Sequence, residues 1–300
     1  MTAISLQNLS KSFGDQIILN QVSLELEENK IYGFVGPNGA GKTTTIKMIL
    51  GLLKVDSGTI SVMGNPVTFG QTKSNQVIGY LPDVPEFYDY MTAQEYLQLC
   101  AGLAQNKTSL PIADLLEQVG LADNQQRIST YSRGMKQRLG LAQALIHNPK
   151  ILICDEPTSA LDPQGRQEIL SIISQLRGQK TVIFSTHILS DVEKVCDQVL
   201  ILTKSGIHNL EDLRDKASAS VNQLNLLIKV SDNEAQKLAL RFPLNQKDQY
   251  YKVHLELSEA NNREQALASF YRYLVEQEIT PYFIELLEDS LEDFYLEVIK

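Results

Sequence analysis

Hydrophobic and polar residues alternate over residues 22–26, and residues 3–6 are mostly apolar. Alternation with a period of two is typical of strands that bury one face and expose the other, and we expect strands in both stretches. Ile60 and Val62 continue the pattern after a Ser-Gly turn. We therefore predict a β portion of antiparallel strands in the first 65 or so residues.

Short, mostly apolar runs follow, at residues 31–35, 151–154 and 181–184. Runs of this length predict buried strands. Between them, apolar residues recur at helical spacing over residues 46–53 and 164–176. Strands that alternate with helices predict an α/β fold with a mostly parallel sheet, in which ligands bind at the carboxyl ends of the strands.

In the middle of the chain, apolar residues recur at the spacing of a helix. Residues 93–120 contain two successive apolar faces at helical spacing, and a further helix begins after Ser132 and ends at Asn148-Pro149. Proline cannot continue a helix and is common just beyond its end. We predict a helical insertion at about residues 86–148.

The pattern changes again after Asp212, where residues 216–220 are polar. Beyond them we predict strands at 224–230, 250–257 and 282–287, and helices at 233–242, 262–277 and 290–299. These elements suggest a small α+β domain. We expect a first domain at residues 1–216 and an accessory domain at residues 217–300.

A complete G-x-x-x-x-G-K-[ST] motif joins the strand at 31–35 to the helix after it. Glycines let backbone N–H groups wrap a polyphosphate, and the helix directs its positive end at the same anion. Lys42 adds charge for the β- and γ-phosphates, and Thr43 is the expected magnesium ligand. The alternative is a glycine-rich turn without function, which does not explain why a strand directly precedes the motif and a helix directly follows it. The expected nucleotide-binding residues are Gly36, Pro37, Asn38, Gly39, Ala40, Gly41, Lys42, Thr43 and Thr44.

Two carboxylates end the apolar run at 151–154. Asp155 is the expected magnesium carboxylate, and Glu156 is placed to polarise a water for in-line attack on the γ-phosphate. The alternative is an acidic junction between a strand and a turn. Together with the phosphate-binding loop, the pair predicts a nucleotide hydrolase.

Composition limits the partners and the compartment. The net charge is −9, and residues 217–300 hold 8 Lys or Arg against 14 Asp or Glu. Without an evident basic face we expect no nucleic-acid partner. No run reaches the ~18 apolar residues of a membrane span, and no signal peptide precedes the first strand, so we expect a cytoplasmic protein. Three widely spaced cysteines fit a reducing compartment.

With these residues the chain resembles the ATP-binding cassette family, over roughly residues 3–205, and in particular the separate ATPase subunits of ABC exporters. Residues 131–138, Tyr-Ser-Arg-Gly-Met-Lys-Gln-Arg, are similar to the family's signature motif. The resemblance implies ATP and Mg²⁺ as cofactors. It also implies a head-to-tail dimer in which Ser132 and Gly134 of one subunit close over ATP held by Lys42 of the other.

Three more residues match family motifs. Asp162, in Ser-Ala-Leu-Asp, matches the D-loop of the dimer interface, and His187 matches the switch histidine that reaches the γ-phosphate. Phe13 lies where the family places an aromatic ring on adenine. A lone histidine at a strand end is ordinarily structural, and Phe13 can equally be a core or turn aromatic. The resemblance implies Glu156 and His187 as the catalytic pair.

The chain departs from the family pattern at two places. Asp83 takes the position of a magnesium-contacting glutamine, and we expect it to reach the metal through a water. Residues 203–210 are shorter than the usual hairpin. Residues 289–296, Asp-Ser-Leu-Glu-Asp-Phe-Tyr-Leu, are similar to the ending of exporter ATPases and equally predict a capped helix with Ser290 as N-cap.

The leading hypothesis is an ATPase subunit, peripheral on the inner face of the cell membrane, that powers a separate permease, with a homodimer favoured over a heterodimer. Phe87, Tyr88, Tyr90 and Met91 either dock that permease or pack inward. One alternative is a soluble ABC ATPase acting on ribosomes or DNA, which would carry two cassettes or long heptad insertions. Another is an ATP-binding switch without turnover, which Glu156 and His187 disfavour.

Overall fold

The computed structural model describes residues 1–71, 73–103, 110–122, 125–203, 206–210, 223–247, 249–256 and 263–287. The chain divides into two compact units, Met1–Leu210 and Glu211–Lys300. The expected boundary at 216/217 lies outside the described residues. Within the described part, no helix is both long enough and apolar enough to cross a bilayer.

A six-stranded sheet forms the centre of the first unit, in the order β10-β9-β3-β8-β7-β6. Five strands are parallel, and only β10 runs antiparallel to its neighbour β9. This confirms the α/β fold with a mostly parallel sheet. The strands are β3 (Ile31–Val35), β6 (Ile78–Leu81), β7 (Ile151–Asp155), β8 (Thr181–Thr186), β9 (Gln198–Thr203) and β10 (Gly206–Asn209).

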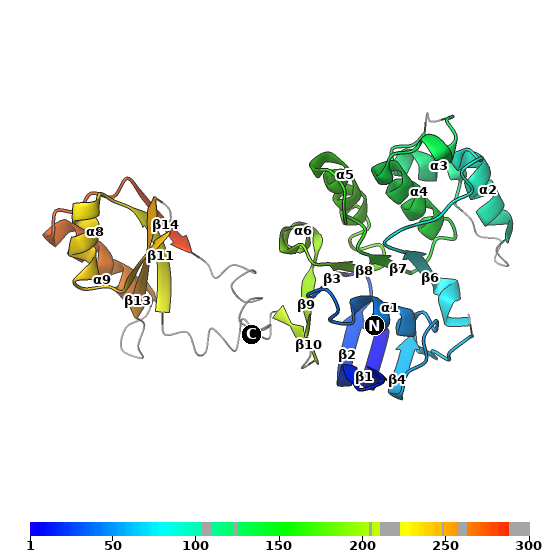
Figure 1. Cartoon of the computed structure of the whole chain (residues 1–300), viewed down its shortest axis with the longest axis horizontal. Helices are drawn as coiled ribbons and strands as arrows, with labels where there is room; N and C mark the ends of the chain where they lie inside the picture. Colours follow the sequence, from blue (N-terminus) through cyan, green and yellow to red (C-terminus); the bar gives the residue numbers. More distant parts are fainter. Residues whose placement is uncertain are drawn as a thin grey trace. The chain divides into compact units, whose positions relative to one another are not determined.

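A second, antiparallel sheet has the order β2-β1-β4-β5. It consists of β1 (Thr2–Phe13), β2 (Gln16–Glu27), β4 (Ser57–Val62) and β5 (Asn65–Pro66). Its apolar face shares one buried cluster with the central sheet and with α1 (Lys42–Ile49). Figure 1 shows α1 with this sheet on one side of the central sheet, and α5 (Pro163–Ser174) and α6 (Leu189–Val195) on the other.

Helices fill the segment between β6 and β7. They are α2 (Ala93–Leu103), α3 (Ile112–Gln118) and α4 (Arg133–Leu145), and the 3₁₀ turn η2 (Ile128–Thr130) precedes α4. A further 3₁₀ turn, η1 (Lys73–Val77), precedes β6. A reciprocal cap starts α2, since Glu95 accepts from the Thr92 N–H at 2.8 Å and the Glu95 N–H donates to Thr92 Oγ1 at 3.3 Å. The three helices group together beyond the β6 edge of the sheet (Figure 1).

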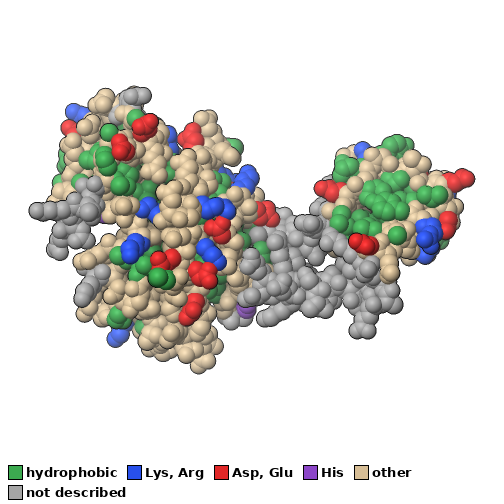
Figure 2. Space-filling view, turned by 180° about the vertical axis from the view of Figure 1, so that it is seen from behind, with side chains coloured by type: hydrophobic (Ala, Val, Ile, Leu, Met, Phe, Trp, Pro, Cys, Tyr) green, Lys and Arg blue, Asp and Glu red, His purple; other side chains and the backbone are tan. Residues whose placement is uncertain are grey.

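The second unit has the order β11 (Gln223–Lys229), α8 (Asp232–Ala239), β12 (Leu244–Lys247), β13 (Tyr250–Glu256), α9 (Arg263–Glu276) and β14 (Phe283–Leu287). Its sheet is antiparallel, in the order β12-β13-β11-β14. This is the β-α-β-β-α-β arrangement of ferredoxin-like domains. The helix expected at 290–299 lies outside the described residues. Figure 2 shows hydrophobic side chains gathered on one surface of this unit.

Several short strands are absent from the sequence-based prediction. β6 has four residues, contains a glycine and precedes a proline, so it has no recognisable alternation. The short segment 203–210 nevertheless supplies an edge strand, because β10 pairs with β9 from Gly206 opposite Thr203 to Asn209 opposite Leu200. Tertiary pairing decides such strands, and local pattern does not.

Candidate active site

The phosphate-binding loop connects buried β3 to α1. Gly39 and Gly41 have φ of +82° and +102°, a backbone region that side chains with a Cβ rarely adopt. A Cβ on Gly41 would also lie 2.5 Å from Ile18 Cγ2. Gly41 is the N-cap of α1, and Pro37, Asn38 and Gly39 are exposed. The loop therefore presents backbone N–H groups and a helix start to solvent, as a polyphosphate requires.

Lys42 is the first residue of α1, and its side chain is only 7% exposed. Its ammonium donates to the carbonyl of Gly36 at 2.7 Å and lies 3.5 Å from the carbonyl of Pro37. It also forms an ion pair with Glu156 Oε1 at 3.3 Å. The loop's cation and the carboxylate after β7 are therefore in direct contact.

Glu156 contacts two of the predicted site residues. Its Oε2 lies 2.9 Å from His187 Nδ1, so the carboxylate lies between the ammonium of Lys42 and the imidazole. Its N–H donates to Ser185 Oγ at 2.9 Å and to the Ser185 carbonyl at 3.1 Å. Glu156 has a φ of +49°. These bonds to β8 stabilise a left-handed backbone that a glutamate rarely adopts.

Asp155 is 3% exposed and accepts a hydrogen bond from Ser185 Oγ at 2.7 Å. Burial, followed by the negative charges of Asp155 and Asp83, raises the pKa of Tyr80 to about 12. Thr43 is exposed at the start of α1. Among the residues that the structure describes, no three His, Cys, Asp or Glu side chains form a metal cluster. Magnesium suits such a sparse donor set, since it usually binds through one or two carboxylates, several waters and phosphate oxygens.

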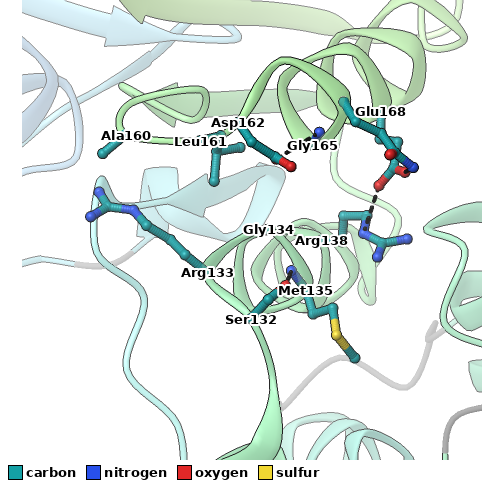
Figure 3. A pocket seen from close by; sticks show the side chains of 11 residues that line it. Ser132, Arg133, Gly134, Met135, Arg138, Ala160, Leu161, Asp162, Gly165 and Glu168 are labelled. Atoms are coloured by element: carbon teal, nitrogen blue, oxygen red, sulfur yellow. Dashed lines mark hydrogen bonds and ion pairs between the residues drawn. The ribbon is translucent and has the colours of Figure 1, made fainter.

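Ser132, Gly134 and Asp162 line one open pocket of about 440 Å³. Ser132 caps α4 by accepting from the Met135 N–H at 3.2 Å, and Asp162 caps α5 by accepting from the Gly165 N–H at 3.0 Å. Figure 3 shows the start of α4 facing the segment 160–162 and the start of α5. Two helix N-termini thus meet at this pocket.

Asp83 lies near the signature helix α4. Its Oδ1 is 3.7 Å from Arg133 Nη2, and its carbonyl accepts from Gln137 Nε2 at 2.6 Å. The Oδ1 atom is buried and makes no hydrogen bond. An oxygen with unused acceptor capacity fits an outer-sphere metal contact, although the closest cation is Arg133.

Phe13 ends β1 and is 50% exposed, which excludes the core position that the alternative allowed. The ammonium of Lys11 lies 5.1 Å from the centre of its ring. Lys11 pairs with Asp56 at 2.6 Å, and Lys11 and Ser12 hold the pKa of that carboxyl at about 2. The ammonium of Lys11 therefore lies over one face of a half-exposed ring, and the other face can take a planar ligand.

A buried polar cluster beside the site has no counterpart in the sequence-based prediction. Asp191 on α6 is fully buried and accepts from Thr158 Oγ1 at 2.9 Å and from Arg166 Nε at 2.5 Å. Arg166, on α5, also donates to Ser190 Oγ at 2.9 Å. Thr158 follows Glu156 and Asp191 follows His187 by a few residues. The cluster therefore joins the two chain segments that leave the site.

Comparisons with known proteins identify the family. The family model for ABC transporter matches residues 19–159. The uncharacterized ABC transporter ATP-binding protein YxlF of Bacillus subtilis (strain 168) is 44% identical over 230 residues, which are 74% of this chain and 76% of that protein. The bacitracin transport ATP-binding protein BcrA of Bacillus licheniformis is 34% identical over 302 residues, 99% of this chain and 97% of that protein.

A solved structure of the ATP binding subunit of an ABC transporter matches with a TM-score of 0.61 at 30% identity, over 72% of this chain and 93% of that chain. Its coverage agrees with the size of the first unit, which carries every site residue described above. The phosphate-binding loop, the carboxylates after β7 and this likeness lead to one conclusion. The chain belongs to the ATP-binding cassette family, as an ATP-hydrolysing subunit of the ABC transporter type.

Proposed function

We propose that the chain hydrolyses ATP at the junction of Lys42, Glu156 and His187 and thereby drives a separate membrane permease of the exporter type. The contact of Glu156 with both Lys42 and His187 carries this proposal. It brings together a phosphate-binding cation, a carboxylate base and an imidazole, from the ends of three parallel strands. These are the groups that in-line attack of water on a γ-phosphate needs.

Each residue has a distinct role. Lys42 and the loop Gly36–Thr44 hold the phosphates, Glu156 orients and polarises the attacking water, and His187 reaches the γ-phosphate. Thr43 and Asp155 would hold Mg²⁺, with Asp83 acting through a water, and the ion would neutralise charge on the phosphates. The buried Asp155 supports the metal role, since its hydrogen bond from Ser185 Oγ fixes the carboxylate.

We further propose that the pocket of Ser132, Gly134 and Asp162 receives the ATP of a second subunit, and we favour two copies of this chain. Two helix starts with available N–H groups suit an anion. No residue of the loop Gly36–Thr44 lines this pocket. One subunit therefore offers its two anion-binding surfaces to two different nucleotides.

The permease would dock on residues 84–91, on the inner face of the cell membrane. Phe87 packs on Tyr96 with ring centres 5.1 Å apart, while Tyr88 and Tyr90 are 52% and 66% exposed. Exposed aromatic residues in one segment are typical of interaction surfaces. The likeness to BcrA along nearly the whole chain supports an exporter. The likeness of 99% of this chain to a transport ATP-binding protein disfavours the alternative that acts on ribosomes or DNA.

The variant Glu156→Gln tests the catalytic role. Amide in place of carboxylate keeps the shape of the side chain and removes its basicity, so we expect ATP affinity to persist while turnover falls ~10²–10⁴-fold. Without hydrolysis, the variant should accumulate as an ATP-bound dimer in sedimentation with magnesium-ATP. Turnover at the parent rate would contradict the assignment of Glu156 as the base.

A further inference from the structure

Two arginines line the pocket at Ser132, and the protein itself occupies one of them. Arg138 donates to the carbonyls of Val119 at 3.2 Å and Gly120 at 3.0 Å. It also pairs with Glu168 at 3.5 Å, and its side chain is only 17% exposed. The guanidinium of Arg138 is therefore fixed in the wall of the pocket.

Arg133 is held much less firmly. Its side chain is 46% exposed, and its Nη2 lies 3.7 Å from Asp83 Oδ1, which is too far for a hydrogen bond. Figure 3 shows Arg133 directed away from Arg138 and Glu168, which point toward each other. The side chain of Arg133 makes no hydrogen bond with any residue that the structure describes, so its N–H groups are available to a ligand.

The position of Arg133 in α4 favours a ligand over a structural role. It is the first residue of the helix, directly after the N-cap Ser132, and the first turn contains no acidic residue. A helix start has a partial positive charge, so a cation there is unfavourable unless an anion is also present. With an anion at the start of α4, the guanidinium and the helix would attract the same group.

Asp83 keeps the arginine in place without satisfying it. The carbonyl of Asp83 accepts from Nε2 of the buried Gln137 at 2.6 Å, which anchors the residue to α4. Its carboxylate and Arg133 are both about half exposed, and water screens such a pair strongly. A phosphate group can accept two N–H bonds from a guanidinium and therefore competes well with a distant carboxylate.

We propose that Arg133 is a phosphate-binding residue for the nucleotide of a second subunit, and that Asp83 holds its guanidinium beside the pocket until that nucleotide binds. This role rests on the proposed function, in which the pocket receives the ATP of another copy. On association, Arg133 exchanges the carboxylate of Asp83 for a phosphate. It adds a charge to the neutral donors at the start of α4, and a dimer of two copies contains this contact twice.

Association of the full-length Glu156→Gln variant tests this role, because without hydrolysis ATP should hold the dimer together. Each charge-assisted contact should count about tenfold, so Arg133→Gln in this background should raise the dimer dissociation constant about a hundredfold at saturating magnesium-ATP. Arg133→Lys keeps the charge without the planar donor pair and should have an intermediate effect. Sedimentation measures all three dissociation constants.

Lys136→Gln is the matched control. It removes a cation from the same helix, but Lys136 pairs with Asp89 at 3.2 Å and does not line the pocket. We expect its dimer dissociation constant to change less than about twofold, as for an exposed ion pair. Equal dissociation constants in Arg133→Gln and Lys136→Gln would overturn the role of Arg133 and leave that of the pocket intact.

Asp83→Asn distinguishes phosphate binding from a structural role of the pair. If Arg133 and Asp83 only stabilise the subunit, both variants should weaken the dimer alike. In the proposed role Asp83 competes with phosphate, so Asp83→Asn should leave the dimer equally tight or tighter, whereas Arg133→Gln weakens it. Saturating magnesium minimises any effect of the metal contact proposed for Asp83. Equal weakening by the two variants would overturn the proposal.

Two further results separate this role from the proposed function. The ATP affinity of the monomer should be the same with Arg133→Gln as in the parent chain, because no residue of the loop Gly36–Thr44 lines the pocket. Loss of that affinity, measured by titration calorimetry, would contradict a role confined to the second subunit's nucleotide. Absence of any ATP-dependent dimer in Glu156→Gln itself would contradict the proposed function, and the role of Arg133 with it.

Discussion

The two surfaces of the first unit that we propose bind phosphate are built differently. The loop Gly36–Thr43 has a nearly buried cation, Lys42, and a carboxylate only 3.3 Å from it. The pocket at Ser132 is open, and its arginines have lateral partners: Arg133 lies 3.7 Å from Asp83, and Arg138 lies 3.5 Å from Glu168. The loop surface therefore has a nearly buried cation at its centre, whereas the open pocket has two helix starts beside charged side chains, of which both arginines pair with carboxylates.

This difference implies a division of labour. A nearly buried ammonium interacts strongly with phosphate because little water screens it, so the loop can bind a nucleotide by itself. Donors in an open pocket compete with water and gain affinity only when a second surface excludes that water. We therefore expect nucleotide binding to depend on the loop, and subunit association to depend on the pocket.

Lys42→Ala should have the largest effect. Loss of the ammonium removes phosphate stabilisation in the ground state and the transition state alike, so both ATP binding and turnover should fall, with kcat lower by ~10²–10³-fold or more. Lys47→Ala, at an exposed position of the same helix, is the matched control. Titration calorimetry and phosphate release measure the two quantities. Normal ATP affinity in Lys42→Ala would contradict our expectation that nucleotide binding depends on the loop.

Ser132→Asp should separate association from binding. Aspartate can still cap α4, so the stability of the helix should change by less than ~1 kcal/mol, but its charge repels a phosphate of the second subunit. We expect normal ATP affinity of the monomer and no ATP-dependent dimer in sedimentation. Ser132→Asn keeps the cap without the charge and serves as the control. A dimer of normal strength in Ser132→Asp would show that the pocket does not face phosphate.

Variants of the cluster at Asp191 test whether the chain segments that follow β7 and β8 are coupled in stability. Asp191→Asn leaves Arg166 without its carboxylate, and we expect the free energy of unfolding to fall by ~1–3 kcal/mol. A double-mutant cycle with Arg166→Gln should give a coupling of ~0.5–3 kcal/mol. If the cluster also positions His187, turnover should fall while ATP affinity persists. Additive effects on unfolding would show that the two side chains do not interact.

Asp83→Ala should have the smallest effect. A carboxylate that acts through a water contributes less than a direct ligand, so turnover should fall about tenfold at limiting magnesium and recover in part at saturation. ATP binding without magnesium should not change. Asp83→Gln restores the residue type usual for the family and is the control. Turnover equal to that of the parent across a magnesium titration would limit Asp83 to its contact with Arg133.

The sequence predicted those parts of the site that follow from strand order. Parallel strands bring their carboxyl ends to one edge, so Lys42, Glu156 and His187 could be expected to meet although they are far apart in the chain. The contact of Arg166 with Asp191 joins two helix faces 25 residues apart, and no local pattern encodes it. Likewise β6 and β10 depend on pairing with neighbours, because four residues are too few to show a period.

The ion pair between Lys42 and Glu156 has a consequence for the order of events at the site. A phosphate that approaches Lys42 meets a cation already neutralised by a carboxylate, so binding amounts to the exchange of one anion for another. In the proposed mechanism, the same exchange releases Glu156 from Lys42 and lets it accept a proton from water. The proposed base would then become available only after ATP has replaced it at Lys42, so that the catalytic carboxylate is released only when substrate is bound.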